Sequence, residues 1–76
     1  MNKVEIYTSD TCVYCHRAKE FFEENNISYI EHNISRDAEV RKSLMLKGYR
    51  SVPLIVINNV EVLGFDRDKI SDLLKI

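Results

Sequence analysis

The chain has 76 residues, 45% hydrophobic and 30% charged, which are the proportions of a soluble globular protein. Its net charge of −1 argues against nucleic-acid binding, which needs a basic footprint. No apolar run is long enough to span a membrane, and the first residues lack a signal-peptide core. We therefore expect one domain over residues 1–76, located in the cytoplasm, without nucleic-acid or membrane partners.

The first half of the chain predicts two strand–helix units. An alternating strand over 4–7 and a polar turn precede a helix over about 13–25, capped by Thr11 or Cys12. Residues 27–34 predict a second strand, and residues 35–47 a second helix that ends at Gly48. The inward positions expected from helical spacing are Tyr14, Ala18, Phe21 and Phe22 in the first helix, and Val40, Leu44 and either Met45 or Leu46 in the second.

The second half predicts a hairpin and a last helix. Strands over 54–57 and 60–63 flank Asn58-Asn59, a typical two-residue hairpin turn. Residues 64–66 end the hairpin and cap a helix whose apolar residues are Ile70, Leu73 and Leu74. The order β-α-β-α-β-β-α predicts an α/β fold with a four-stranded mixed sheet, because the βαβ unit is parallel and the hairpin antiparallel. Three helices flank this sheet.

Two cysteines, Cys12 and Cys15, stand at the junction of the first strand and the first helix. They are too close in sequence to staple distant parts of the fold, and the cytosol keeps thiols reduced, so the pair indicates redox or metal chemistry. A helix N-terminus, hydrogen bonds to the sulfur and the nearby His16 and Arg17 all favour a thiolate. We expect Cys12, at the exposed helix entrance, to attack a disulfide, and the more covered Cys15 to resolve the mixed disulfide.

Three other interpretations of the cysteines remain open at this point. Cys12, Cys15, His16 and His32 offer four zinc ligands, although the second half lacks the usual ligand spacing. Residues 12–16 also form the C-x-x-C-H pattern of c-type haem attachment, which belongs to exported proteins. The third interpretation is a pair of inert buried thiols. We expect His16 to be solvated on the first helix, and we assign His32 no role.

Three motifs together resemble the glutaredoxins over essentially the whole chain. They are Thr11-Cys12-Val13-Tyr14-Cys15-His16-Arg17-Ala18-Lys19 after the first strand, Ser51-Val52-Pro53 before the third, and Gly64-Phe65-Asp66 after the fourth. The resemblance implies a thioredoxin-like fold and glutathione-linked reduction of protein disulfides and glutathione mixed disulfides. It also implies a monomer that has glutathione as a co-substrate and no bound cofactor or metal.

The resemblance also implies roles for individual residues. Cys12 is the nucleophile and Cys15 the resolving thiol, while Tyr14 matches the tyrosine of the family's C-P-Y-C. Pro53 matches the family's cis-proline. Val52 would offer backbone hydrogen bonds to the cysteinyl part of glutathione. The γ-glutamyl end would be held by Gly64, Phe65 and Asp66.

Several positions depart from the glutaredoxin pattern. Val13 replaces the proline of C-P-Y-C, and Ser9 replaces a lysine that binds a glutathione carboxylate. Five basic residues against two acidic ones between positions 36 and 50 give a local charge of +3, and we expect Arg50 to take over the role of that lysine. The segments 48–50 and 64–65 look more like NrdH-redoxins, which thioredoxin reductase reduces and which supply ribonucleotide reductase. A third alternative is a module that binds a metal or an iron–sulfur cluster through Cys12.

Overall fold

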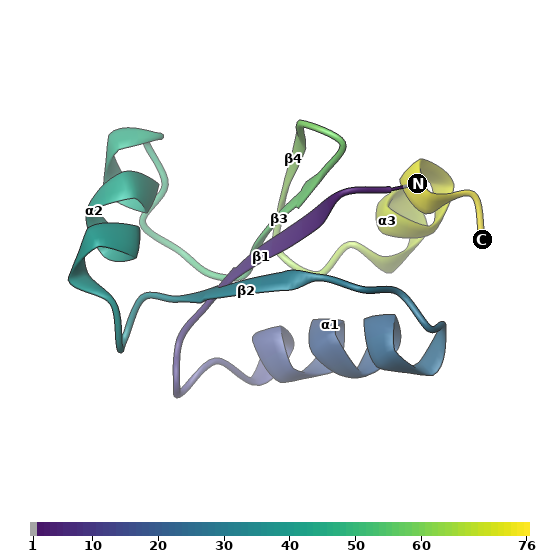
Figure 1. Cartoon of the computed structure of the whole chain (residues 1–76), viewed down its shortest axis with the longest axis horizontal. Coiled ribbons are helices and arrows are strands. Elements are labelled where there is room, and N and C mark those ends of the chain that lie inside the picture. The colour runs from purple at the N-terminus through teal and green to yellow at the C-terminus, as the bar shows by residue number, and fades with distance from the viewer. Residues whose placement is uncertain (1) are drawn as a thin grey trace.

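Four strands form one mixed sheet in the order β2-β1-β3-β4, and three helices flank it (Figure 1). The computed structural model describes residues 2–76. The predicted order of elements is confirmed. The elements are β1 (Val4–Thr8), α1 (Val13–Glu24), β2 (Ile30–Asn33), α2 (Ala38–Leu46), β3 (Leu54–Ile57), β4 (Val60–Leu63) and α3 (Arg67–Leu74).

The strand register brings three chain segments to one end of the sheet. β1 runs parallel to β2 and antiparallel to β3, and β3 is antiparallel to β4. Leu54, the first residue of β3, pairs with Tyr7 near the end of β1 and with Leu63 at the end of β4. The loop after β1, the loop before β3 and the loop after β4 therefore all leave the sheet at the same end.

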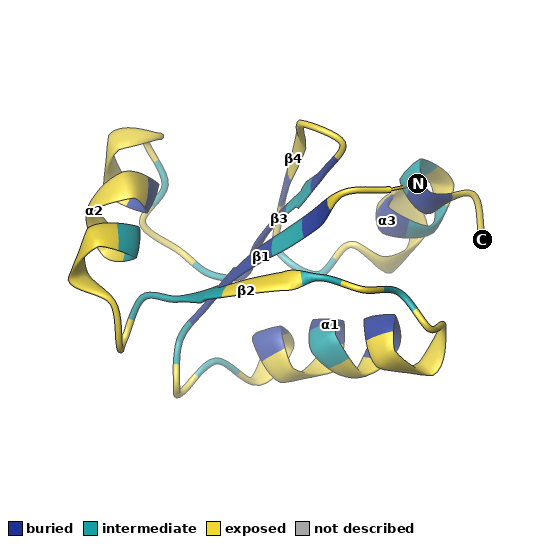
Figure 2. Ribbon diagram, viewed as in Figure 1, coloured by how far each residue is buried: buried dark blue, intermediate teal, exposed yellow. Residues whose placement is uncertain are grey.

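The two faces of the sheet are covered unequally. The larger core cluster joins alternate residues of the strands to α1 and α3, and the smaller cluster joins the other face to α2. Figure 2 shows the buried residues concentrated on β1, β3 and the inner sides of α1 and α3. The larger cluster contains Val4, Ile6, Ala18, Phe21, Phe22, Ile55, Ile57, Val62, Ile70 and Leu74, and the smaller one Tyr7, Leu44 and Leu54.

Local turn chemistry explains where the elements end. Asn58 and Asn59 both have positive φ (50° and 72°), as the two-residue hairpin requires. After α2, Gly48 has φ 91° and donates to the carbonyl of Met45, while Tyr49 donates to the carbonyl of Leu44. These two hydrogen bonds form a Schellman motif, which places Tyr49 against Leu44 in the smaller cluster.

The second strand is shorter than the predicted range 27–34. A second Schellman motif ends α1: Asn26 has φ 56°, and the N–H of Ile27 donates to the carbonyl of Phe22. Ile27 therefore packs against the core from this turn instead of joining the sheet, and β2 begins only at Ile30. The prediction of a strand at residues 27 and 29 is wrong, because Ile27 completes the end of α1 and the ring of Tyr29 packs against Phe22.

Two predicted inward positions are also wrong. Tyr14 is 60% exposed, because Cys15 occupies the inward position of the first helical turn. Neither Met45 nor Leu46 faces inward: their exposures are 57% and 79%, since α2 reaches the sheet only through Leu44 and the half-buried Val40. The other expected core positions on α1 and α3 are buried or partly buried.

Candidate active site

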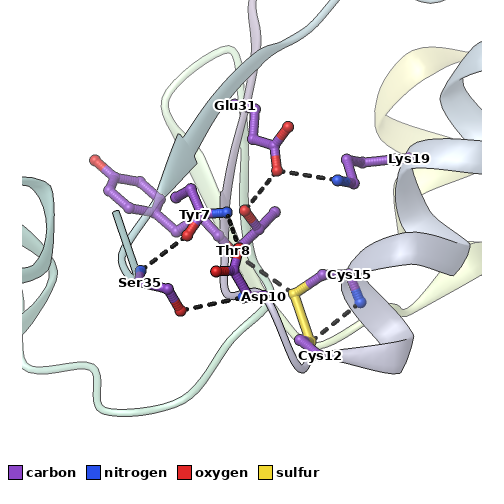
Figure 3. Close-up of a disulfide and its surroundings, with 9 residues drawn as sticks. Tyr7, Thr8, Asp10, Cys12, Cys15, Lys19, Glu31 and Ser35 are labelled. Atoms are coloured by element: carbon purple, nitrogen blue, oxygen red, sulfur yellow. Dashed lines mark hydrogen bonds and ion pairs between the residues drawn. A yellow bond between two sulfur atoms is a disulfide. The ribbon is translucent and has the colours of Figure 1, made fainter. Parts of the chain in front are cut away.

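Cys12 and Cys15 are joined in a disulfide at the start of α1, directly after the loop that leaves β1 (Figure 3). Cys12 is the N-cap, with φ −90° and ψ 107°, and its Sγ accepts a hydrogen bond from the N–H of Cys15 at 3.1 Å. A sulfur thus takes the place of the oxygen that normally caps a helix. When the disulfide is reduced, the same N–H and the positive end of the helix face the Cys12 thiolate.

The two sulfurs differ in their access to a substrate. Cys15 is 1% exposed, and its Sγ lies 4.0 Å from the carbonyl oxygen of Tyr7, below the helix entrance. Cys12 is only half-buried. The Cα atoms are 5.2 Å apart, so Cys15 reaches Cys12 Sγ without backbone rearrangement. The predicted difference in exposure between the cysteines is confirmed.

No acidic residue occupies the first turn of α1, so no carboxylate opposes a thiolate there. His16 and Arg17 are both exposed, and Arg17 lies over the ring of Tyr14, with its Cζ 5.5 Å from the centroid. The predicted solvated position of His16 is confirmed. Val13 and Tyr14 present exposed apolar surface next to Cys12, which suits contact with a substrate chain.

Side-chain contacts tie the loop before Cys12 to the segment after β2. The carboxylate of Asp10 accepts hydrogen bonds from Asn33 Nδ2 (2.9 Å) and Arg36 Nε (3.1 Å), and the N–H of Asp10 donates to Ser35 Oγ (3.1 Å). The bond from Asn33 is the main cause that lowers the pKa of Asp10 below its usual value, and Arg36 adds to it. These contacts hold the loop before Cys12 against its neighbour.

A polar network that sequence patterns did not reveal lies behind the cysteines. Thr8 is 1% exposed, on the face of β1 that also carries Ile6, and its hydroxyl donates to Glu31 Oε2 at 2.7 Å. The same oxygen accepts from Lys19 Nζ of α1 at 3.0 Å. The network therefore joins β1 and β2 to α1, the helix that begins at the two cysteines (Figure 3). The sequence signal for this network is a polar residue, Thr8, at a strand position that faces inward.

We expect the Glu31 network to make folding stability depend on pH. The hydrogen bond from Thr8, followed by the contact with Lys19, lowers the pKa of Glu31 from its usual 4.5. A lowered native pKa stabilises the fold fully above the unfolded value, and this contribution is lost as pH falls from 4.5 through the native value. Urea unfolding between pH 7 and pH 3 should show the stability difference between the wild type and Glu31→Gln shrinking below about pH 4.5.

Glu24→Gln is the matched control, because Glu24 is exposed on α1 and its side chain makes no hydrogen bond or ion pair within residues 2–76. A difference for Glu31→Gln that is the same at both ends of the pH range would contradict the assigned coupling.

Three of the predicted glutathione contacts, Val52, Pro53 and Gly64, lie at the same end of the sheet as the cysteines. The Val52–Pro53 peptide bond is cis, and Pro53 immediately precedes Leu54, which pairs with Tyr7. The N–H of Gly64 donates to the carbonyl of Pro53 at 2.8 Å, so the loops before β3 and after β4 are joined. Val52 is half-buried and Pro53 is buried.

Of the other predicted contacts, Phe65 and Asp66 also have structural partners. The ring of Phe65 lies 5.8 Å from that of Phe21, so its side chain packs against α1. Asp66 is the N-cap of α3 and accepts a hydrogen bond from the N–H of Lys69 at 3.2 Å. Arg50 is exposed and lines a groove beside α2 together with Arg41.

The four residues considered as zinc ligands are not assembled as a metal site. The cysteines are paired with each other, and His32 Nε2 lies 3.2 Å from Glu5 Oε1, with its ring against Tyr7. Within residues 2–76, no group of three or more His, Cys, Asp or Glu side chains is placed to hold a metal ion. In the same range, no helix has the length and apolar character needed to cross a membrane.

Comparison with known proteins agrees with this geometry. The glutaredoxin family model matches residues 4–62. Glutaredoxin 3 of Escherichia coli is 39% identical over 67 residues, covering 87% of this chain and 81% of the relative. The glutaredoxin-like protein NrdH of Escherichia coli is 30% identical over 71 residues, covering 93% and 88% of the two chains.

Solved structures give the same result. The NrdH-redoxin of Escherichia coli, described as having a thioredoxin-like activity profile, has a TM-score of 0.84 at 30% identity and covers 93% of each chain. Glutaredoxin 1 of Francisella tularensis has a TM-score of 0.77 at 34% identity over the full length of both chains. The fold is therefore thioredoxin-like, with a redox-active Cys-x-x-Cys pair at residues 12 and 15. This chain belongs to the glutaredoxin family of thiol–disulfide oxidoreductases.

Proposed function

We propose that this protein is a glutathione-dependent oxidoreductase that reduces protein disulfides and glutathione mixed disulfides. The observation that carries the disulfide-exchange chemistry of the proposal is the position of Cys12 as the half-buried N-cap of α1, with Cys15 buried directly behind it. The first sulfur can meet a substrate, and the second can meet only the first. This is the arrangement that a two-step disulfide exchange needs.

The reaction proceeds through two exchanges of sulfur partners. The Cys12 thiolate attacks one sulfur of the substrate disulfide, forms a mixed disulfide with it and releases the other sulfur as a thiolate, which takes up a proton. The Cys15 thiol loses its proton and attacks Cys12 Sγ, which releases the second substrate thiolate and forms the Cys12–Cys15 disulfide. Two molecules of glutathione then reduce this disulfide and leave as glutathione disulfide.

Glutathione would lie across the loops that meet near the cysteines. The backbone of Val52 would pair with its cysteinyl part in the manner of an added strand. The N–H of Gly64 already donates to Pro53, so the backbone N–H groups of Phe65 and of the first turn of α3 would hold the γ-glutamyl carboxylate. The free oxygen of Asp66 would take the ammonium group. Arg50, two residues before Val52, would bind the glycyl carboxylate in place of the lysine that Ser9 replaces, and Tyr14 would cover the sulfur.

A coupled assay with two electron donors tests the proposal. One arm contains glutathione, glutathione reductase and NADPH, and the other contains thioredoxin reductase and NADPH, with a small mixed disulfide as the substrate in both. We expect turnover in the glutathione arm and a raised glutathione KM, at nearly unchanged kcat, for Arg50→Ala. An unchanged glutathione KM would contradict the role proposed for Arg50. Absence of turnover in the glutathione arm would overturn glutathione dependence itself.

The second candidate is an NrdH-type redoxin that is reduced by thioredoxin reductase and supplies ribonucleotide reductase. Two observations favour it: Ser9 supplies no cation beside Cys12, and Arg50 lines the groove beside α2. The similarity to Escherichia coli NrdH over 93% of the chain is also in its favour. Turnover in the thioredoxin reductase arm alone would select this candidate.

A further inference from the structure

We infer that the groove beside α2 binds an acidic segment of the protein whose disulfide is being reduced. The inference rests on one part of the proposed function, the reduction of protein disulfides, and does not depend on the electron donor. It assigns to the site a preferred class of substrate: chains that carry carboxylates within a few residues of the reacting cysteine.

The groove has a volume of about 530 Å³ and is built from two segments. One wall is the turn after β2, and the other is formed by α2 and the residues after it. Leu44 is 2% exposed and forms an apolar base, and Tyr49 is held by its Schellman hydrogen bond and by its hydroxyl, which donates to Glu61. The lining residues used here are Ile34, Ser35, Arg41, Leu44, Tyr49 and Arg50.

Hydrogen bonds connect the groove directly to the loop that carries Cys12. Ser35 Oγ, in the groove wall, accepts from the N–H of Asp10 at 3.1 Å, and the N–H of Ile34 donates to the carbonyl of Thr8 at 2.8 Å. Figure 3 shows Asp10 between Ser35 and the disulfide. A chain that is covalently attached to Cys12 therefore has the groove within reach of its next few residues.

The charge of the groove is wholly positive. Its lining includes Arg41 and Arg50 and contains no carboxylate. Within residues 2–76, neither arginine forms an ion pair. Glu61 on β4 is engaged by Lys47 at 3.5 Å and by Tyr49. Two exposed guanidinium groups above an apolar base complement a segment that alternates acidic and apolar side chains.

The covalent bond to Cys12 explains why a groove this open is sufficient to hold a substrate segment. Once the mixed disulfide forms, the attached substrate segment is at a high effective concentration beside the groove, so weak contacts hold it while Cys15 attacks. Before that step, the arginines attract acidic segments from solution, an effect that salt weakens. The volume suits a short extended segment and not a folded domain.

The test compares two peptides that differ only in charge. Each has one cysteine disulfide-bonded to 2-thiopyridine; glutamates flank it in one peptide and glutamines in the other. The pre-reduced protein attacks the peptide sulfur through Cys12, the peptide becomes bound to Cys12, and the released thiopyridine is measured by absorbance. The quantity of interest is the ratio of the two second-order rate constants, acidic over neutral. No glutathione or reductase is present, so this result and the coupled assay can fail independently.

We expect the wild-type ratio to exceed one and to fall as salt rises, and Arg41→Glu to lower it about fivefold. Arg41→Gln should give a smaller decrease and guards against misfolding of the charge-reversed variant. Lys42→Glu is the matched control, because it makes the same charge change one residue along α2, outside the groove lining. A ratio that Arg41→Glu leaves unchanged, or that Lys42→Glu lowers equally, would overturn the inference.

Discussion

Replacing Cys12 with serine should abolish the reduction of both protein disulfides and glutathione mixed disulfides, by a factor of order 10³ or more. The serine hydroxyl can still cap α1, because it can accept the hydrogen bond that the N–H of Cys15 gives to the sulfur. The fold is therefore retained while the nucleophile is lost. The measurement is a single-turnover reaction of the pre-reduced protein with each substrate, alongside urea unfolding of the same sample.

A chemical experiment on the wild type provides an independent check. Limiting iodoacetamide should alkylate the reduced protein at Cys12 first, because Cys15 is 1% exposed and Cys12 is half-buried at the helix entrance. Mass spectrometry of the digested protein locates the label. Activity retained in Cys12→Ser, or a first label on Cys15, would reverse the roles assigned to the two thiols.

The arrangement of elements could be predicted because local signals in the sequence agreed with one another. The pair Asn58-Asn59 between two apolar strands specified a hairpin, and the structure gives both residues the positive φ that such a turn needs. The cysteine spacing after an alternating strand placed Cys12 at a helix cap and Cys15 one turn further, where the structure places them. These features depend on residues that are close together in the chain.

The predictions that are wrong concern residues whose local pattern fits two different structures. Ile27 has the apolar side chain of a strand residue, but Asn26 before it adopts the left-handed conformation that closes α1, so Ile27 packs as part of a helix end. Met45 and Leu46 follow Leu44 in an apolar run, and helical spacing admits any of them as inward. Only the position of α2, at the margin of the sheet, selects Leu44 (Figure 1).

Features of the site that depend on tertiary contacts were not accessible from the sequence. The hydroxyl of Thr8 meets Glu31, 23 residues away, because β1 and β2 pair in parallel, and Lys19 reaches the same oxygen from α1. The positive charge between residues 36 and 50 is evident from the sequence, but charge counting does not say which of its side chains meet in space. The structure shows that Arg41 and Arg50 share one groove, although they are nine positions apart.

The second cysteine variant should separate two reactions that the wild type performs with one site. Cys15→Ser should retain the reduction of glutathione mixed disulfides, because a second glutathione molecule can resolve the intermediate on Cys12. Dithiol reduction of protein disulfides should fall by a factor of order 10² or more, because an intramolecular thiol acts at an effective concentration that free glutathione does not match. The substrate protein should then remain bound to Cys12 as a mixed disulfide that survives non-reducing electrophoresis.

The surroundings of Cys15 allow a serine at this position without loss of the fold, so the two reactions can be compared in a folded protein. Cys15 Sγ lies 4.0 Å from the carbonyl oxygen of Tyr7, so this carbonyl is an acceptor for the hydroxyl of a serine at position 15. Cys15→Ala, which places no polar group in this buried position, shows whether a loss of activity comes from destabilisation or from the missing thiol. If both variants reduce protein disulfides at the wild-type rate, with no trapped intermediate, Cys15 is not the resolving thiol. The two-step exchange would then have to use a thiol from outside this chain.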